Sequence, residues 1–168
     1  MTTSAAPADS PAFDPKAFRA ALGRYSTGVA VVMARCADGR TAGMTINSFA
    51  SVSLDPPLVL WSMQRGSASS DIFRAAGGFT VSILGEEHEP LARAFAKSDD
   101  SKLAHEAVVP APSGHPHLAG VVAWFDCATD AIHAGGDHDI FVGHVTAFGQ
   151  SPGRTLTFHD GKFFTSGA

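Results

Sequence analysis

Cysteine and long apolar runs are both scarce in this chain. Its 168 residues include two cysteines, Cys36 and Cys127, far apart and without a CxxC pair, so neither a disulfide framework nor a cysteine-based metal site is expected. We interpret both as buried thiols of a protein in a reducing compartment. The longest apolar run, residues 29–34, is far shorter than the roughly 20 residues that span a bilayer. No membrane partner is therefore expected, and the cytoplasm is the expected location.

Basic residues are also few. The chain has 12 Lys and Arg against 16 Asp and Glu, a formal net charge of -4, and no basic cluster, so a nucleic-acid partner is not expected. Residues 1–12 are rich in Ala, Ser, Thr and Pro and lack the basic start and apolar core of a secretory signal, which predicts a flexible N-terminal tail. Residues 13–168 have the length and apolar content of one globular domain.

Several chemical motifs are missing. The chain has no GxxxxGK[ST] phosphate loop, no GxGxxG dinucleotide fingerprint and no GxSxG nucleophile elbow. His138 and His144 share a face of a predicted strand but lie about 20 Å apart at roughly 3.3 Å per residue. One metal ion cannot reach both, and no other metal-ligand spacing is present, so no metal is expected.

Strand patterns outnumber helical ones. Helices are predicted over residues 14–25, with Asp14 as N-cap and one face packed inward, and over 69–76 and 87–97. Strands are predicted over 28–35, 41–46, 58–63, 79–84, 120–129, 131–133, 139–150 and 156–164, and residues 98–118 form a long connection with at most one short helix. Because helices do not alternate regularly with the strands, we expect a mostly antiparallel closed barrel with a few short helices.

A polar loop over residues 44–53 lies between two apolar strand candidates. Its short side chains can offer hydrogen bonds to a flat polar ligand, and a planar heterocycle is the leading candidate. The alternative is that the same groups only satisfy their own turn. The groups in question are Thr45, Asn47, Ser48, Ser51 and Ser53.

Two further segments carry polar side chains beside predicted strands. Residues 64–70, QRGSASS, combine Arg65 with serines where a strand leads into a helix, a composition suited to phosphate, although a serine-rich helix cap is the alternative. Residues 135–144 form a glycine turn that delivers Asp137 and His138 to the start of a strand.

In order along the chain, the stretch GMTINSFASVSLDPPLVLWS, the serine-containing turn after it and GDHDIFVGHV resemble the short-chain flavin reductase family. These are the FMN-binding split-barrel reductases of two-component monooxygenases, and the similarity runs from about residue 13 to 164. The resemblance implies a mainly β fold with short α-helices, a split β-barrel that forms a homodimer. It also implies that FMN or FAD, held near the subunit interface, is reduced by NADH or NADPH and then serves a separate oxygenase.

Site residues carry over from the same motifs. The isoalloxazine wall is expected from Met44, Thr45, Ile46, Asn47, Ser48, Ala50, Ser51 and Val52. The ribityl chain and phosphate are expected at Ser62, Arg65, Ser67 and Ala68, with Phe95 and Lys102 near the flavin tail. His138 is expected to contact the nicotinamide as a positioning residue in catalysis, and Asp137 is expected to hold its turn.

Two alternatives stay open. One is a flavoprotein that keeps its flavin and oxidises or reduces an organic substrate, and the other is a non-catalytic flavin or haem carrier on the same barrel. Ile46 stands where many relatives have a smaller residue, so the sequence leaves pocket width and flavin preference undecided.

Overall fold

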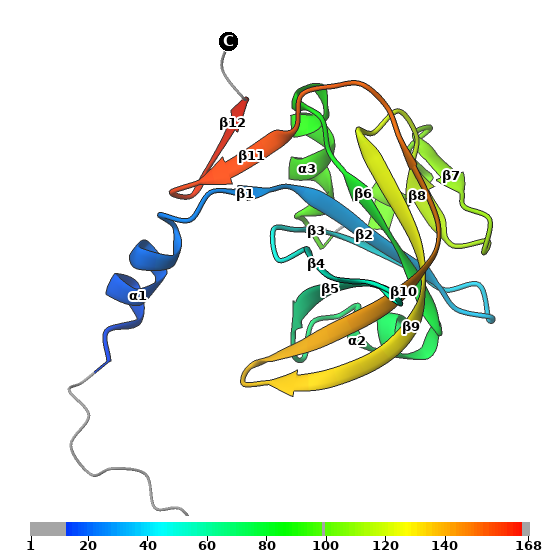
Figure 1. Cartoon of the computed structure of the whole chain (residues 1–168), viewed down its shortest axis with the longest axis horizontal. Coiled ribbons are helices and arrows are strands. Elements are labelled where there is room, and N and C mark those ends of the chain that lie inside the picture. The colour runs from blue at the N-terminus through cyan, green and yellow to red at the C-terminus, as the bar shows by residue number, and fades with distance from the viewer. Residues whose placement is uncertain (1–12, 99, 166–168) are drawn as a thin grey trace, which may run out of the picture.

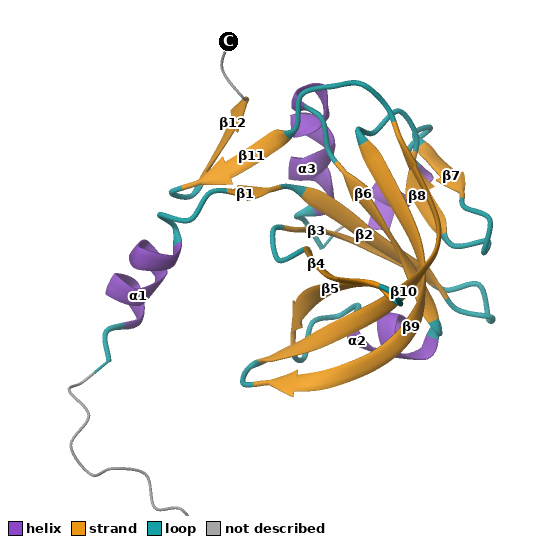
Figure 2. Cartoon of the chain, viewed as in Figure 1, coloured by secondary structure: helices purple, strands orange, loops and turns teal. Residues whose placement is uncertain are grey.

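The computed structural model describes residues 13–98 and 100–165, and the expected tail over residues 1–12 lies outside the described residues. Strands dominate and the helices are short (Figure 2). The helices, including the 3-10 turns η1 and η2, are α1 Pro15–Leu22, α2 Ser70–Ala75, η1 Glu86–His88, α3 Glu89–Phe95 and η2 Asp100–Ala104. The strands are β1 Thr27–Gly28, β2 Ala30–Arg35, β3 Thr41–Ile46, β4 Ala50–Leu54, β5 Pro57–Gln64, β6 Gly78–Ile83, β7 Val108–Pro110, β8 Pro116–Leu118, β9 Ala123–Gly135, β10 His138–Gln150, β11 Leu156–His159 and β12 Lys162–Thr165.

A curled seven-stranded sheet is the centre of the fold, with strand order β3-β2-β6-β9-β10-β5-β4 (Figure 1). Every neighbouring pair in it is antiparallel. The expected mainly β, split-barrel architecture is confirmed. The expected full closure is wrong, because β4 folds back on β5 as a hairpin and, among the described strands, the outer edges of β3 and β4 do not pair.

Strand β2 separates two apolar clusters. Val32 on one of its faces belongs to a cluster with Trp61 and Phe141, while Val31 and Met33 on the other face pack with residues of α3, β8 and β11. A strand buried on both faces is apolar throughout rather than alternating. This explains the continuous apolar run in the sequence at this point.

Aromatic rings fill the first cluster. The Trp61 ring lies 4.6 Å from Phe141, 5.0 Å from Phe73 and 5.7 Å from Phe79, measured between centroids, and all four side chains are buried. These rings come from β5, β10, α2 and β6, and aromatic pairs at such distances add stability beyond the apolar area they bury. The cluster therefore ties α2 to β5, β6 and β10.

Two sequence-based expectations about loops are corrected. The polar stretch 44–53 is mostly strand, since β3 continues to Ile46 and β4 begins at Ala50, leaving only residues 47–49 as a loop. Strand β4 was missed although Ala50, Val52 and Leu54 alternate with two serines, because the serine hydroxyls indicated a polar loop. The connection over 98–118 holds η2 and also the two-stranded pair β7–β8, whose prolines had argued against strands.

Helix α1 begins as expected, with the Asp14 carboxylate accepting a hydrogen bond from Lys16 N at 2.9 Å. The expected inward packing is wrong, because α1 extends away from the sheet (Figure 1) and none of its residues is buried within this chain. Phe18 and Leu22 are 48% and 58% exposed. No helix among the described residues is long and apolar enough to cross a bilayer.

The expectation of two buried thiols is confirmed. Cys127 is 1% exposed on β9, and Cys36 is 6% exposed and donates to the Ile72 carbonyl at 3.4 Å. Burial raises the pKa of the Cys127 thiol to about 12, so this side chain is a neutral thiol at physiological pH.

Gly43 provides a test of the packing between β3 and α3. A Cβ at this position would lie 2.8 Å from the ring of Phe95, which is itself 1% exposed. We expect Gly43→Ala to lower the free energy of unfolding by about 1–3 kcal/mol through overpacking. Urea unfolding measures this.

Gly28→Ala is the matched control, because no atom lies within 4 Å of a Cβ built there. We expect it to change the unfolding free energy by no more than about 0.5 kcal/mol. Equal stability of the two variants would contradict the packing described at Gly43.

Candidate functional site

A pocket of about 220 Å³ opens between β3, the loop that follows β5, and the end of α3. Its lining combines backbone and small side chains from β3 with a serine-rich loop and two lysines. The lining residues are Thr41, Gly43, Met44, Thr45, Ser67, Ala68, Ser69, Ile72, Phe95, Ala96, Lys97, Ser98 and Lys102. We call this the central pocket.

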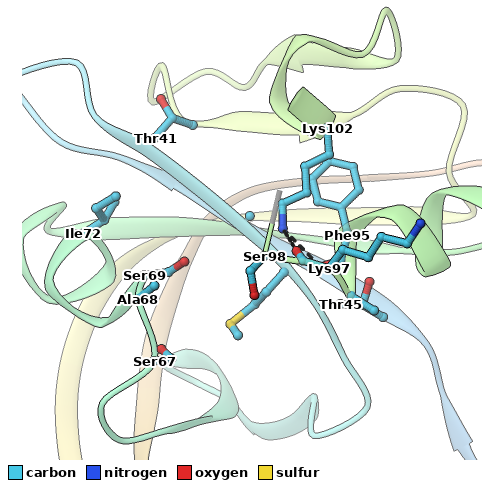
Figure 3. A pocket seen from close by; sticks show the side chains of 13 residues that line it. Thr41, Thr45, Ser67, Ala68, Ser69, Ile72, Phe95, Lys97, Ser98 and Lys102 are labelled. Carbon is cyan, nitrogen blue, oxygen red and sulfur yellow. Dashed lines mark hydrogen bonds between the residues drawn. The ribbon is translucent and has the colours of Figure 1, made fainter. Parts of the chain in front are cut away.

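The serine-rich loop forms one side of the central pocket (Figure 3). The Ser67 hydroxyl is shielded from solvent and has no hydrogen-bond partner among the described residues. An unpaired hydroxyl of this kind costs free energy unless something bonds to it. Its position in the lining therefore fits a ligand with a polar group at this side.

Phe95, Lys97 and Lys102 lie on the opposite side (Figure 3). The Lys102 ammonium is 3.4 Å from the Phe95 carbonyl and 5.7 Å from the centroid of the Phe95 ring, so it is held over the end of α3. None of the described lining residues is acidic. The Lys102 ammonium on this side favours an anionic ligand such as a phosphate ester, whereas the Lys97 side chain points away from the pocket (Figure 3).

Strand β3 supplies the floor. The Thr45 hydroxyl donates to the Ala92 carbonyl of α3 at 2.6 Å, so this hydroxyl is already engaged within the protein. What remains on β3 for a ligand is mainly backbone and the Met44 side chain. A flat ring suits such a surface better than a polyol does, because few side-chain hydroxyls are free to meet it.

A second hollow continues from the central pocket. Ile46 and Asn47 line it together with the C-terminal aromatic residues Phe158 and Phe163. Thr45 and Ala96 line both spaces, so the two lie next to each other along β3.

The other residues expected at the isoalloxazine wall line neither of these two spaces. Ser48 and Ser62 bond to each other, with Ser62 N donating to the Ser48 hydroxyl at 3.0 Å and that hydroxyl lying 3.2 Å from the Ser62 carbonyl. Ala50 and Val52 are exposed on β4. Ser51 lines a separate apolar groove on the outer side of β4 and β5.

Asp137 and His138 lie at the turn between β9 and β10. The His138 ring bonds to the Asp137 carboxylate at 2.8 Å, and this bond lowers the pKa of Asp137. Arg65 lies beside the turn rather than in the pocket lining: its backbone N–H donates to the Asp137 carbonyl at 2.9 Å, and its Nε donates to Asp139 at 2.9 Å. The turn is thus joined directly to the loop that carries Ser67.

The structure thus brings together in the central pocket most of the residues expected near the flavin tail, and the turn of Asp137 and His138 lies beside the loop that carries Ser67. Residues missed from the sequence are Thr41, Gly43, Ser69, Ile72, Ala96, Lys97 and Ser98. Alternation along β3 could have indicated two of them, since Thr41, Gly43 and Thr45 share one face of the strand. No sequence signal indicated Asp139, because an acidic residue in a strand is usually exposed.

Comparison with known proteins gives relatives of one kind. The chain is 39% identical over 91% of its length to a protein of Rhizobium meliloti named probable flavin reductase. It is 39% identical over 88% of its length to the reductase component of flavin-dependent trigonelline monooxygenase of Acinetobacter baylyi. The chain spans about half the length of both relatives, 49% and 47% respectively.

A solved structure is similar over almost the whole of both chains. The NADH:FAD oxidoreductase SgcE6 of Streptomyces globisporus, in complex with NAD and FAD fragments, is 35% identical and superposes with a TM-score of 0.84. The similarity covers 92% of this chain and 96% of that one.

The sequence profile of the flavin reductase like domain matches residues 22–167, which includes both sides of the central pocket and the His138 turn. The family resemblance predicted from the motifs is confirmed. This chain therefore belongs to the flavin reductase like domain family.

Proposed function

We propose that this protein is an NAD(P)H:flavin oxidoreductase, which transfers a hydride from NADH or NADPH to FMN or FAD. The observation that carries the proposal is the central pocket itself. It presents a Ser67 hydroxyl with no partner among the described residues and the Lys102 ammonium, beside a flat strand surface. This combination suits a phosphorylated ligand with a flat ring, and the His138 turn lies next to it.

Bound flavin would supply the redox chemistry, by accepting the hydride of the nicotinamide. The task of this chain is to bind and orient. Ser67 and Lys102 would meet the ribityl and phosphate groups, and the backbone of β3 with Met44 would lie along the ring. His138 would orient the nicotinamide, since hydride transfer needs reacting atoms about 3–3.5 Å apart.

We also propose that the protein works as a homodimer. The apolar groove on the outer side of β4 and β5 has a volume of about 370 Å³ and is lined by Phe49, Leu58 and Phe125 among others. Leu54 and Phe148, which also line it, are 94% and 71% exposed. Apolar area buried between two copies stabilises by about 25 cal/mol per Å², and a second copy would cover these side chains.

An oxygenase that receives reduced flavin is the proposed partner. The relative from Acinetobacter baylyi is named as the reductase component of a flavin-dependent monooxygenase. Release of reduced flavin to a second protein requires that flavin leave the pocket, and the central pocket has exposed residues such as Ala68 and Lys97 in its lining.

Steady-state oxidation of NADH and NADPH, each with FMN, FAD and riboflavin, tests the proposal. We expect oxidation that depends on added flavin. A protein that stays yellow through dialysis would support the rival flavoprotein with tightly held flavin. Bound flavin without any oxidation of NADH or NADPH would support a non-catalytic carrier.

His138→Ala tests the nicotinamide assignment. We expect the KM for the preferred nicotinamide to rise, or kcat to fall, by roughly tenfold, the effect of losing one positioning contact of about 1.4 kcal/mol. Flavin affinity, measured by fluorescence titration, should change less than about twofold, because His138 lies outside the central pocket. A comparable loss of flavin affinity would contradict the assignment.

Arg65→Ala tests for a phosphate contact. Its Nε is used by Asp139, which leaves the terminal nitrogens of the guanidinium to meet an anion. Loss of one charged hydrogen bond should weaken FMN by about 10-fold or more. Riboflavin, which lacks the phosphate, should bind nearly as before, and equal weakening of both ligands would remove Arg65 from this role.

A further inference from the structure

A buried carboxylate lies directly after His138. Asp139 is the second residue of β10, and its side chain is 3% exposed. One oxygen accepts from Arg65 Nε at 2.9 Å, and the other accepts from an Nη nitrogen of Arg74. Burial raises the pKa of Asp139, but the hydrogen bonds from Arg65 and Arg74 outweigh it and the pKa is lowered overall. The carboxylate is therefore charged at neutral pH.

This carboxylate joins three segments of the chain. Arg65 lies on the loop that leads to Ser67, and Arg74 lies on α2, while Asp139 follows the turn that carries His138. We call the two ion pairs of Asp139, with Arg65 and with Arg74, the clamp. Beside it, the backbone N–H of Arg65 donates to the Asp137 carbonyl at 2.9 Å. One side chain thus holds the wall of the central pocket and the β9–β10 turn in a fixed relation.

Helix α2 gives the clamp a rigid support. Phe73, the neighbour of Arg74, is 1% exposed and packs against Trp61 at 5.0 Å, while Ile72 lines the central pocket. The turn itself has little support of its own, because residues 135–137 are exposed. Its position therefore depends on β10 and on the clamp.

We propose that Asp139 is a positioning residue, which through Arg65 and Arg74 fixes the His138 turn relative to the central pocket and so sets the distance from nicotinamide to flavin. The inference rests on the proposed function. Without the negative charge, two guanidinium groups would face each other with no counterion, and one of them would move. A displacement of about 1 Å is enough to slow a transfer that needs close contact by up to about 100-fold.

Asp139→Asn is the test, since it removes the charge and keeps the shape. Riboflavin serves as the hydride acceptor. Because it lacks the phosphate, a contact between Arg65 and a flavin phosphate cannot affect the measured rates. We expect the KM for NADH, or for NADPH if that is preferred, to rise at least about tenfold or kcat to fall by as much. The riboflavin dissociation constant should stay within about twofold, and the isotope effect with 4-deuterated nicotinamide should rise as hydride transfer becomes slower.

Asp126→Asn is a matched control. Asp126 is also a fully buried carboxylate, and it accepts from Ser113 N at 2.8 Å and from the Ser113 hydroxyl at 2.6 Å, in a part of β9 remote from the turn. We expect this variant to lose stability without a change in the nicotinamide KM or in the isotope effect. Comparison of the two variants separates a loss of positioning of the His138 turn from a general loss of stability.

The outcomes distinguish the inference from the function on which it rests. A wild-type protein without flavin-dependent oxidation of either nicotinamide would overturn both. An active wild-type protein with an Asp139→Asn variant unchanged in KM, kcat and isotope effect would overturn the inference alone.

Arg74→Met covers the case in which Asp139→Asn does not fold. It removes one arm of the clamp at a side chain that is 45% exposed, and Arg65 still neutralises Asp139. We expect the nicotinamide KM to rise or kcat to fall, as for Asp139→Asn but by a smaller factor. Kinetics identical to wild type would overturn the inference.

Discussion

The pairing of β5 with β10 is the constraint on which the candidate site depends. Its register places His138 opposite Gln64 and His144 opposite Leu58. A slip of one residue would turn every side chain of β10 to the other face. Phe141 would then leave the aromatic cluster and Asp139 would face solvent, so the same register that builds the core also brings the two site turns together.

The site combines elements of the packed core with two turns at the edge of the sheet. Strand β3 and the start of α2 are fixed by the two apolar clusters, and they supply the flat surface and one wall of the central pocket. The turns that carry Ser67 and His138 are loops positioned on this scaffold, as binding residues commonly are.

Much of the fold could be predicted from local patterns. The hairpin of β2 and β3 follows from a β-branched run and the Asp38-Gly39 turn, and the entry to β5 follows from the proline pair. The direction of α1 could not be predicted, because an amphipathic pattern shows that a face needs a partner but not which surface provides it. The edge strand β4 does alternate, with Ala50, Val52 and Leu54 set against two serines, but five residues are a short signal beside the hydroxyl-rich composition that suggested a loop.

The site was predictable in its segments but less so in its contacts. The motifs indicated the loop at Ser67 and the turn at His138, and the structure shows these lying together. The motifs could not show that the Thr45 hydroxyl is used by Ala92, that Ser48 and Ser62 bond to each other, or that Arg65 reaches Asp139. Each of these bonds joins positions far apart in sequence, and side-chain pairing at such separations has no local signature.

The burial of both cysteines bears on chemical durability. A reductase that releases reduced flavin in air works in the presence of hydrogen peroxide, because reduced flavin reacts with oxygen. Peroxide attacks the thiolate form of cysteine, and its rate follows exposure and thiolate character. Cys127, neutral and 1% exposed, and Cys36, 6% exposed, offer little to attack. Burial of both thiols therefore protects them from the hydrogen peroxide that reduced flavin, the proposed product, generates with oxygen.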